Sequence, residues 1–274
     1  MNKLTTEKRT QIVACLVEGN SIRSTVRMTE AAKNTVTKLL VDLGQACSKY
    51  QDETLRNLEC SSIQVDEIWS FCYSKQKNVP EDKQGQFGYG DVWTWTSICA
   101  DSKLVPSWMI GGRDSEWANV FMNDLTSRLK HRVQLSSDGH KTYLEAVEGA
   151  LGCEVDHAML IKMYGKSLEG ERRYSPSEYI GTEFRKITGN PDPQKASTSY
   201  VERNSLTMRM GMRRFTRLTN AFSKKVENLE CAVALHFMYY NFSRIHRTLK
   251  VTPAMAAGVT NKRWEIKDIV GLLA

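Results

Sequence analysis

Several features that define common protein classes are missing from this chain. No apolar stretch approaches the roughly 20 residues that span a bilayer. The charged start, MNKLTTEKRTQIV, lacks the apolar core of a secretion signal. The seven cysteines are scattered, and no two of them lie two or three positions apart, so the spacing of a zinc ribbon is absent. We therefore expect a cytoplasmic protein with free thiols and no membrane partner.

Other chemistries are missing as well. The chain has no glycine-rich phosphate loop, no serine in a nucleophile-elbow pattern, no internal repeat and no low-complexity tract. It does have positive charge, with a net +7 over 274 residues. The segment from Thr198 to Lys250 holds ten Lys and Arg against three Asp and Glu, so its net charge equals that of the whole chain. This concentration favours a polyanion as partner, with a solvated basic surface as the alternative.

Residues 1–46 are predicted to form a small all-α domain of three short helices. Apolar residues recur at helical spacing, and Gly19 and Gly44 follow two of these runs as expected helix ends. A short helix, a turn and a second helix fit the helix-turn-helix pattern, in which the start of the last helix contacts DNA. The predicted DNA contacts there are Lys33, Asn34, Thr35, Thr37 and Lys38. A trihelical oligomerisation module stays open as the alternative, because Ala32 stands where a capping Ser or Thr is expected.

After a polar linker over residues 47–60, the pattern changes to that of an α/β domain, residues 61–250. Three runs rich in β-branched and aromatic residues, the first being SIQVDEIWSFCYS, predict a meander of strands. A helix, a strand, a helix and a fifth strand follow. This order predicts a mixed five-stranded sheet flanked by helices, as in the ribonuclease H-like fold. Glycines, prolines and mixed charge make residues 161–197 an expected insertion or long loop, and residues 251–274 a C-terminal tail.

Two aspartates are expected at neighbouring strands of this sheet. Asp66 lies in the middle of the first strand, and Asp138 ends the fourth strand just before Gly139. In the ribonuclease H-like order the first and fourth strands are adjacent, which would place the two carboxylates side by side. They repel each other unless a cation joins them, and Mg²⁺, with Mn²⁺ as a possible substitute, suits such oxygen ligands.

Glu202 supplies the third carboxylate, from the helix that carries the basic segment. It would face two metal ions, which activate a water or a 3′-hydroxyl and stabilise the leaving oxygen, while the arginines meet the DNA backbone. The predicted DNA contacts of this segment are Arg209, Arg213, Arg214, Arg217, Lys224 and Lys225. Simpler interpretations stay open, because an Asp before Gly often forms a turn and a Glu beside Arg often forms a surface pair. The rival carboxylates are Asp101, Asp114 and Asp156.

Three stretches resemble the transposases of the insertion-sequence-one family of bacterial mobile elements, within the DDE transposase and retroviral integrase superfamily. They are VDEIWSF, SSDGHKTYLEAV and YVERNSLTMRMGMRRFTRLTNAFSKKVEN. The resemblance covers roughly residues 60–260. It implies that Asp66, Asp138 and Glu202 are the catalytic, metal-binding residues and that Arg209 contacts DNA. The chain departs from the family in the 63 residues between Asp138 and Glu202, and in lacking an N-terminal zinc finger.

Together these observations predict a nucleoid-associated bacterial DNA transposase that cuts element ends and joins the freed 3′-hydroxyl to target DNA. Its expected partner is double-stranded DNA, on which it would act as a homo-oligomer. Two alternatives stay open: a catalytically inert DNA-binding regulator derived from a transposase, and a nuclease that cleaves RNA–DNA hybrids.

Overall fold

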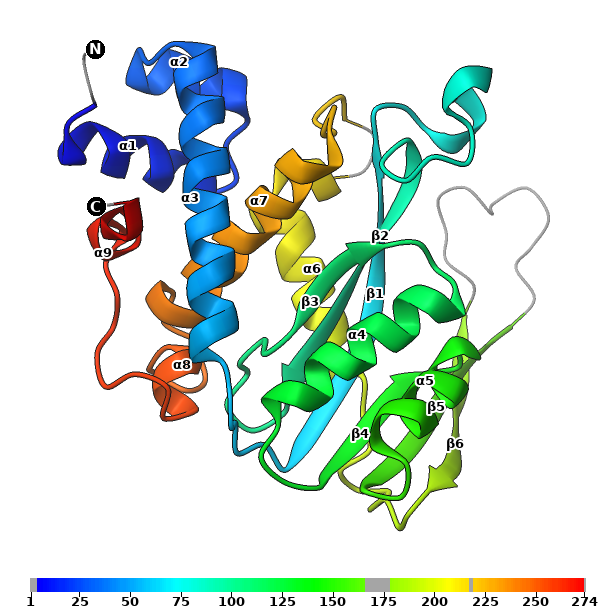
Figure 1. The fold of residues 1–274 in the computed structure, drawn as a ribbon. Coiled ribbons are helices and arrows are strands. Elements are labelled where there is room, and N and C mark those ends of the chain that lie inside the picture. Colours follow the sequence, from blue (N-terminus) through cyan, green and yellow to red (C-terminus); the bar gives the residue numbers. More distant parts are fainter. Residues whose placement is uncertain (1–3, 166–177, 217–218, 274) are drawn as a thin grey trace.

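The computed structural model describes residues 4–165, 178–216 and 219–273 (Figure 1). A six-stranded mixed sheet lies at its centre, in the order β3-β2-β1-β4-β5-β6. The strands are β1 Ser62–Cys72, β2 Gly90–Cys99, β3 Trp108–Gly111, β4 Val133–Asp138, β5 Val155–Tyr164 and β6 Tyr179–Thr188. The strand β1 pairs antiparallel with β2 and parallel with β4, while β5 is parallel to β4 and antiparallel to β6.

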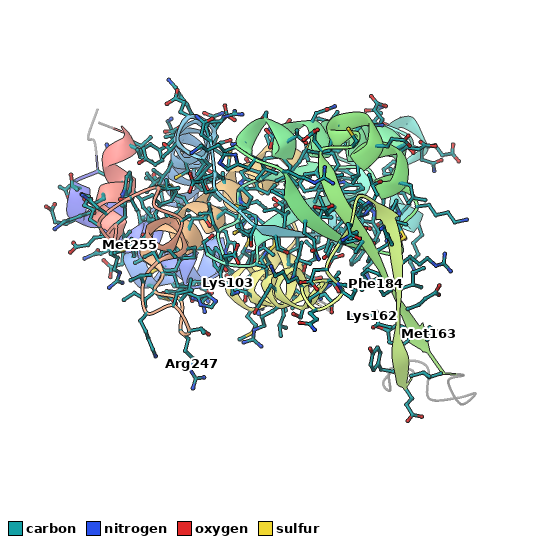
Figure 2. The ribbon with its side chains drawn as sticks, turned by 90° about the horizontal axis from the view of Figure 1, so that it is seen from below. Lys103, Lys162, Met163, Phe184, Arg247 and Met255 are labelled. Carbon is teal, nitrogen blue, oxygen red and sulfur yellow. The ribbon has the colours of Figure 1, made fainter. Side chains whose placement is uncertain are left out.

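Helices cover both faces of the sheet. The longer ones are α1 Thr6–Val17, α2 Ile22–Thr29, α3 Lys33–Thr54, α4 Ser115–Arg128, α5 Thr142–Leu151, α6 Ser199–Gly211 and α7 Val226–Met238. Two short helices near the C-terminus are α8 Pro253–Ala256 and α9 Ile266–Val270. Figure 2 shows α4 and α5 on one face of the sheet and α6 on the other. Within the described ranges, no helix is both long and apolar enough to cross a membrane.

The core sits on both sides of the central strands, because helices exclude water from each face. On the side of α4 and α5, Trp95 is fully buried and meets the rings of Tyr143 and Phe121. On the side of α6, Val201 and Met208 are fully buried. Strands covered on both faces are apolar along most of their length, as β1 is, so the carboxylates that β1 carries stand out.

The predicted adjacency of the first and fourth strands is confirmed, because Ile63 of β1 lies opposite Leu135 of β4. The predicted number of five strands is wrong, since β6 is a sixth strand inside residues 161–197, where we expected an insertion or long loop. The strands β5 and β6 form a hairpin whose far end is exposed on both faces. A strand of that kind lacks the one-sided apolar alternation by which half-buried strands are recognised. Residues 166–177 of the expected insertion lie outside the described residues.

The N-terminal residues form three helices, as expected, but the third does not end at Gly44. The helix α3 continues to Thr54, so residues 47–54 of the predicted linker are helical. A side chain at Gly44 would place its Cβ only 2.4 Å from the Cβ of Cys231 on α7. Gly44 therefore permits the close contact of α3 with α7 and is not a helix end.

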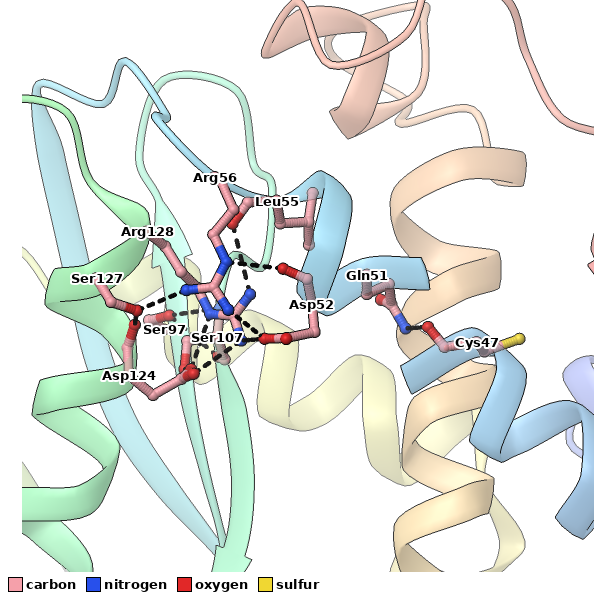
Figure 3. Close-up of polar contacts among 10 residues, drawn as sticks. All are labelled: Cys47, Gln51, Asp52, Leu55, Arg56, Ser97, Ser107, Asp124, Ser127 and Arg128. Carbon is pink, nitrogen blue, oxygen red and sulfur yellow. Dashed lines mark hydrogen bonds and ion pairs between the residues drawn. The ribbon is translucent and has the colours of Figure 1, made fainter. Parts of the chain in front are cut away.

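The C-terminal end of α3 is bound to the α/β domain by a polar network (Figure 3). The guanidinium of Arg128, at the end of α4, contacts carboxylate oxygens of Asp52 and Asp124 at 2.8 Å each. Arg56 donates to the carboxylate of Asp52 and, at 2.7 Å, to Ser127 Oγ. One buried arginine thus joins α3 to α4, and the N-terminal helices and the sheet domain share an interface.

We predict that Gly44→Ala destabilises the protein by about 1–3 kcal/mol, because the added methyl overpacks the contact between α3 and α7. Urea unfolding followed by circular dichroism measures this loss. Gly271→Ala is the matched control, since nothing lies within 4 Å of a Cβ at that position. Equal stability of the two variants would contradict the role given to Gly44.

Candidate active site

The adjacency of β1 and β4 brings Asp66 and Asp138 together. Both lie beyond the last registered pair of these strands, Gln64 with Ser136. Carboxylate oxygens of Asp66, Asp138 and Glu67 all lie within 4.8 Å of one another. The turn after β4 orients Asp138, whose Oδ1 accepts the backbone N–H of His140 at 2.9 Å. Two strands therefore deliver three acidic groups to one point.

The electrostatics of this cluster favour a cation. Burial, followed by the charges of Glu67 and Asp138, raises the pKa of Asp66 to about 7. An ionised Asp66 is thus costly unless positive charge compensates it. The donors are all carboxylate oxygens, which are the ligands that Mg²⁺ and Mn²⁺ prefer. The residues present fit a divalent metal site.

Glu67 is a member of the cluster that our sequence analysis missed. Its side chain is only 1% exposed and forms an ion pair with Arg113 at 2.7 Å. Its other oxygen accepts the hydroxyl of Tyr143 at 3.1 Å. The Arg113 guanidinium also lies over the ring of Trp93, 4.3 Å from its centre. The sequence did hold a signal for Glu67, namely that it follows Asp66 directly in a largely apolar strand. Successive side chains of a strand point to opposite faces of the sheet, so two consecutive acids place a carboxylate on each face.

Glu202 enters the site from the first turn of α6, on the opposite side of the sheet from α4 and α5. One of its oxygens accepts the hydroxyl of Thr198 at 2.5 Å, and the other accepts the ammonium of Lys162 on β5. Glu202 is not part of the set of acids within 4.8 Å of one another. It does line the same pocket, of about 500 Å³, as Asp66 and Asp138. The three predicted residues thus share one pocket, and Glu202 is turned toward Lys162.

Lys162 is the second residue that sequence reasoning missed. It lies within the expected insertion, on β5 opposite Thr182 of β6. Its side chain and that of Glu202 are 34% and 39% exposed, so the pair lies at the rim of the pocket. The ammonium of Lys162 compensates the negative charge of Glu202.

The rival carboxylates make structural contacts elsewhere. Asp101 accepts the backbone N–H and hydroxyl of Ser61, and Asp114 caps α4. Asp156 pairs with Arg132 at 2.8 Å, and this hydrogen bond lowers the pKa of Asp156 to about 2. All three rival carboxylates thus have partners outside the acidic cluster.

A large groove brings together residues from both predicted DNA-binding segments. It has a volume of about 860 Å³ and lies between the N-terminal helices and the chain around α7. The predicted DNA contacts that line it are Lys33, Asn34, Thr37, Arg213, Arg214 and Lys224. Arg23, which we did not single out, lines it as well. Segments nearly 180 residues apart in the chain thus form one cationic groove, which we call the basic groove.

Those of the other predicted DNA contacts that the structure describes lie outside this groove's lining. Lys38 forms an ion pair with Asp42 at 2.6 Å, one turn along α3. Thr35 lies in the first turn of α3. The remaining positions are Lys225 just before α7, Arg209 in the last turn of α6, and Arg217, which lies outside the described residues.

Comparisons with known proteins return only distant structural likenesses. No family model matches the chain, and neither does any curated protein. The piggyBac transposase synaptic complex with hairpin DNA is similar at 10% identity and a TM-score of 0.45, over 100% of this chain and 72% of that one. The Mos1 strand transfer complex is similar at 10% identity and a TM-score of 0.25, over 86% and 80%. A pre-cleavage Mos1 transpososome gives 9% identity and a TM-score of 0.28, over 87% and 78%.

We predict that Lys162→Met tightens Mn²⁺ binding roughly two- to fivefold, because the ammonium competes with a metal ion for Glu202 and exposed ion pairs are weak. Electron paramagnetic resonance of free Mn²⁺ measures the affinity directly. Lys186→Met on β6 is the matched control, since that lysine contacts Asn190 and is not among the residues that line the pocket of Asp66, Asp138 and Glu202. Weaker Mn²⁺ binding in Lys162→Met than in the control would contradict this role.

Proposed function

We propose that this chain is a DDE-type DNA transposase with a ribonuclease H-like catalytic domain, of the kind that insertion-sequence-one elements encode. The observation that carries the proposal is one pocket that holds carboxylates from two adjacent strands and from a helix of the basic segment. The order β3-β2-β1-β4-β5 supports the fold assignment. The proposed reaction is cleavage at element ends followed by joining to target DNA.

Asp66, Asp138 and Glu202 are the proposed metal ligands. Two divalent ions bound there would supply charge neutralisation for the reacting phosphate and activation of the attacking oxygen. The protein holds Asp138 through the N–H of His140 and holds Glu202 through Thr198, so both carboxylates are oriented before any ligand arrives. Lys162 keeps the charge of Glu202 compensated in the meantime.

Glu67 is closer to the two aspartates than Glu202 is, yet we assign it a positioning role. Both of its oxygens are engaged, one by Arg113 and one by Tyr143. Breaking a buried ion pair leaves an uncompensated charge and costs several kcal/mol, on the order of 3–5 kcal/mol. Glu202, at the rim, can exchange Lys162 for a metal ion at much smaller cost. The geometry therefore favours Glu202 as the third ligand.

The basic groove is the proposed binding site for element-end DNA. Its cations come from α2, from the start of α3 and from the chain on both sides of residues 217–218. Lysines and arginines gathered along one groove bind phosphates and release counterions, so the affinity depends strongly on salt. The start of α3 is also the part of a helix-turn-helix that reaches base edges. Duplex DNA held there would be positioned by phosphate contacts from both segments.

Asp66→Asn and Glu202→Gln are expected to lower the rates of DNA nicking and joining by at least about 100-fold. Replacing a residue that only hydrogen-bonds to a metal ligand already lowers metal affinity or activity about 10–100-fold, and loss of a ligand itself should cost more. The substrate is a supercoiled plasmid that carries the DNA flanking this gene on both sides, incubated with Mg²⁺ or Mn²⁺. The control is Glu183→Gln, whose carboxylate is exposed on β6 and paired with Arg185.

The outcomes separate the candidate functions. Wild-type nicking at the ends of the flanking DNA, lost in both variants, supports the transposase. A wild-type protein that binds the plasmid without nicking it would be the inert regulator, and cleavage of RNA–DNA hybrids without end preference would be the nuclease. Nicking that survives in Asp66→Asn would refute the catalytic assignment.

Lys33→Ala and Arg213→Ala are each expected to weaken DNA binding and to reduce the slope of log affinity against log salt by about 1, because each removes one phosphate contact. Fluorescence anisotropy with labelled flanking DNA at several salt concentrations measures the slope. Lys49→Ala is the control, since Lys49 is exposed near the far end of α3. A slope unchanged from that of the control would exclude the basic groove as the DNA site.

A further inference from the structure

A second cationic pocket lies on the other side of α6 from the acidic cluster. It has a volume of about 220 Å³ and is formed by α6 and by the chain that follows α7. Three arginines line it, Arg203 from α6 and Arg244 and Arg247 from the later segment. No Asp or Glu of the described residues lines this pocket. Its charge is therefore suited to an anion.

A further cation, Lys103, lies close to residues that line the pocket. His246 lines the pocket, and burial, followed by the charges of Lys103 and Arg244, lowers the pKa of His246. The ammonium of Lys103 lies 3.3 Å from the ring centre of Tyr200, another lining residue. Cations therefore approach the pocket from three separate segments of the chain.

The floor of the pocket carries a polar group that is left without a partner. Asn204 lines the pocket but is only 2% exposed. Neither its amide nitrogen nor its amide oxygen has a hydrogen-bond partner among the described residues, and the same is true of Nδ1 of His246. Leaving a buried polar group unsatisfied costs about 1–3 kcal/mol. Because the amide offers both a donor and an acceptor, a phosphate alone cannot satisfy it, whereas the edge of a nucleobase can.

The helix α6 relates this pocket to the acidic one. Glu202 and Thr198 line the acidic pocket, while Arg203 and Asn204, one and two residues later, line the cationic pocket. Figure 2 shows α6 between Lys103, on the side of the cationic pocket, and Lys162, on the side of the acids. One turn of α6 thus contributes residues to both pockets.

We propose that the cationic pocket beside α6 binds one nucleotide of a DNA strand, with its phosphate held by the arginines and its base edge held by Asn204. Adenine is the preferred base, because an asparagine amide pairs with the adjacent donor and acceptor of adenine. This inference rests on the proposed function for its partner, a DNA strand. It assigns to that strand a second contact, separate from the basic groove.

The test uses small probes in EDTA, so that it does not depend on DNA cleavage. Binding of deoxyadenosine monophosphate, deoxythymidine monophosphate, deoxyadenosine and inorganic phosphate to the full chain is followed by nuclear magnetic resonance and calorimetry. We expect deoxyadenosine monophosphate to bind at least about tenfold more tightly than deoxyadenosine or phosphate, since both halves of the pocket contribute. We expect it also to bind more tightly than deoxythymidine monophosphate.

Two variants test the two halves separately. Arg247→Ala should weaken both nucleotides at least about fivefold and leave deoxyadenosine unchanged, because it removes one charged hydrogen-bond donor. Asn204→Leu, which keeps the number and branching of the side-chain heavy atoms, should abolish the preference for adenine and leave phosphate binding unchanged. Arg185→Ala on β6 is the control for lost surface charge.

The outcomes also separate this inference from the proposed function. Equal binding of phosphate and deoxyadenosine monophosphate, or no effect of Arg247→Ala beyond that of the control, would overturn the nucleotide site. Failure of the wild-type protein to nick flanking DNA, together with the expected nucleotide preference, would overturn the transposase and leave the nucleotide site in place.

Discussion

The mutual repulsion of two carboxylates on neighbouring strands is the constraint on which the rest of the site depends. The pairing of β1 with β4, which ends at Gln64 and Ser136, holds Asp66 and Asp138 close together. Cationic side chains pair with the other two acids nearby. Arg113 compensates Glu67 on one side of the sheet, and Lys162 compensates Glu202 on the other. What remains uncompensated is the pair of aspartates, where burial already makes a single negative charge costly. The negative charge of the pocket therefore favours the binding of a cation.

The helix α6 distributes its residues between two environments. Successive residues on an α-helix point about 100° apart, since 3.6 residues complete a turn. Glu202 faces the acids, and Asn204, two residues on, lines the cationic pocket and is deeply buried. A carboxylate followed directly by an arginine is therefore not a surface pair here, because the two side chains line different pockets.

The parts of the fold that could be predicted from the sequence are those where local pattern and burial agree. The strand β1 is largely apolar because both faces are covered, so the two acids in its middle, Asp66 and Glu67, stand out. The exposed strand β6 has no such pattern, since neither of its faces packs on a core at the far end of the hairpin. Gly44 follows an apolar run as helix ends do, and only its distance from Cys231 on α7 reveals the other reason for a glycine.

In the candidate site, too, some residues could be predicted from the sequence and others could not. Asp66, Asp138 and Glu202 occur in recognisable surroundings, at a strand centre, a strand end and a helix start. Arg113, the partner of Glu67, belongs to a loop, and Lys162, the partner of Glu202, belongs to the expected insertion. No local pattern distinguishes one cation from another in these segments. Which cation meets which acid is decided by tertiary packing, and a single sequence does not record it.

The length of the helix α3 limits how the N-terminal helices can be exchanged between proteins. Its first turn borders the basic groove, and its last turns are bound by Arg128 and by the contact of Gln51 with α7. Twenty-two helical residues form a stiff rod about 33 Å long. A chimera that exchanged residues 1–46 would cut this rod in its middle and would change the register of Gly44 against Cys231. The N-terminal helices of this protein are therefore a poor choice for domain shuffling, and a graft should retain α3 and α7 as one inherited unit.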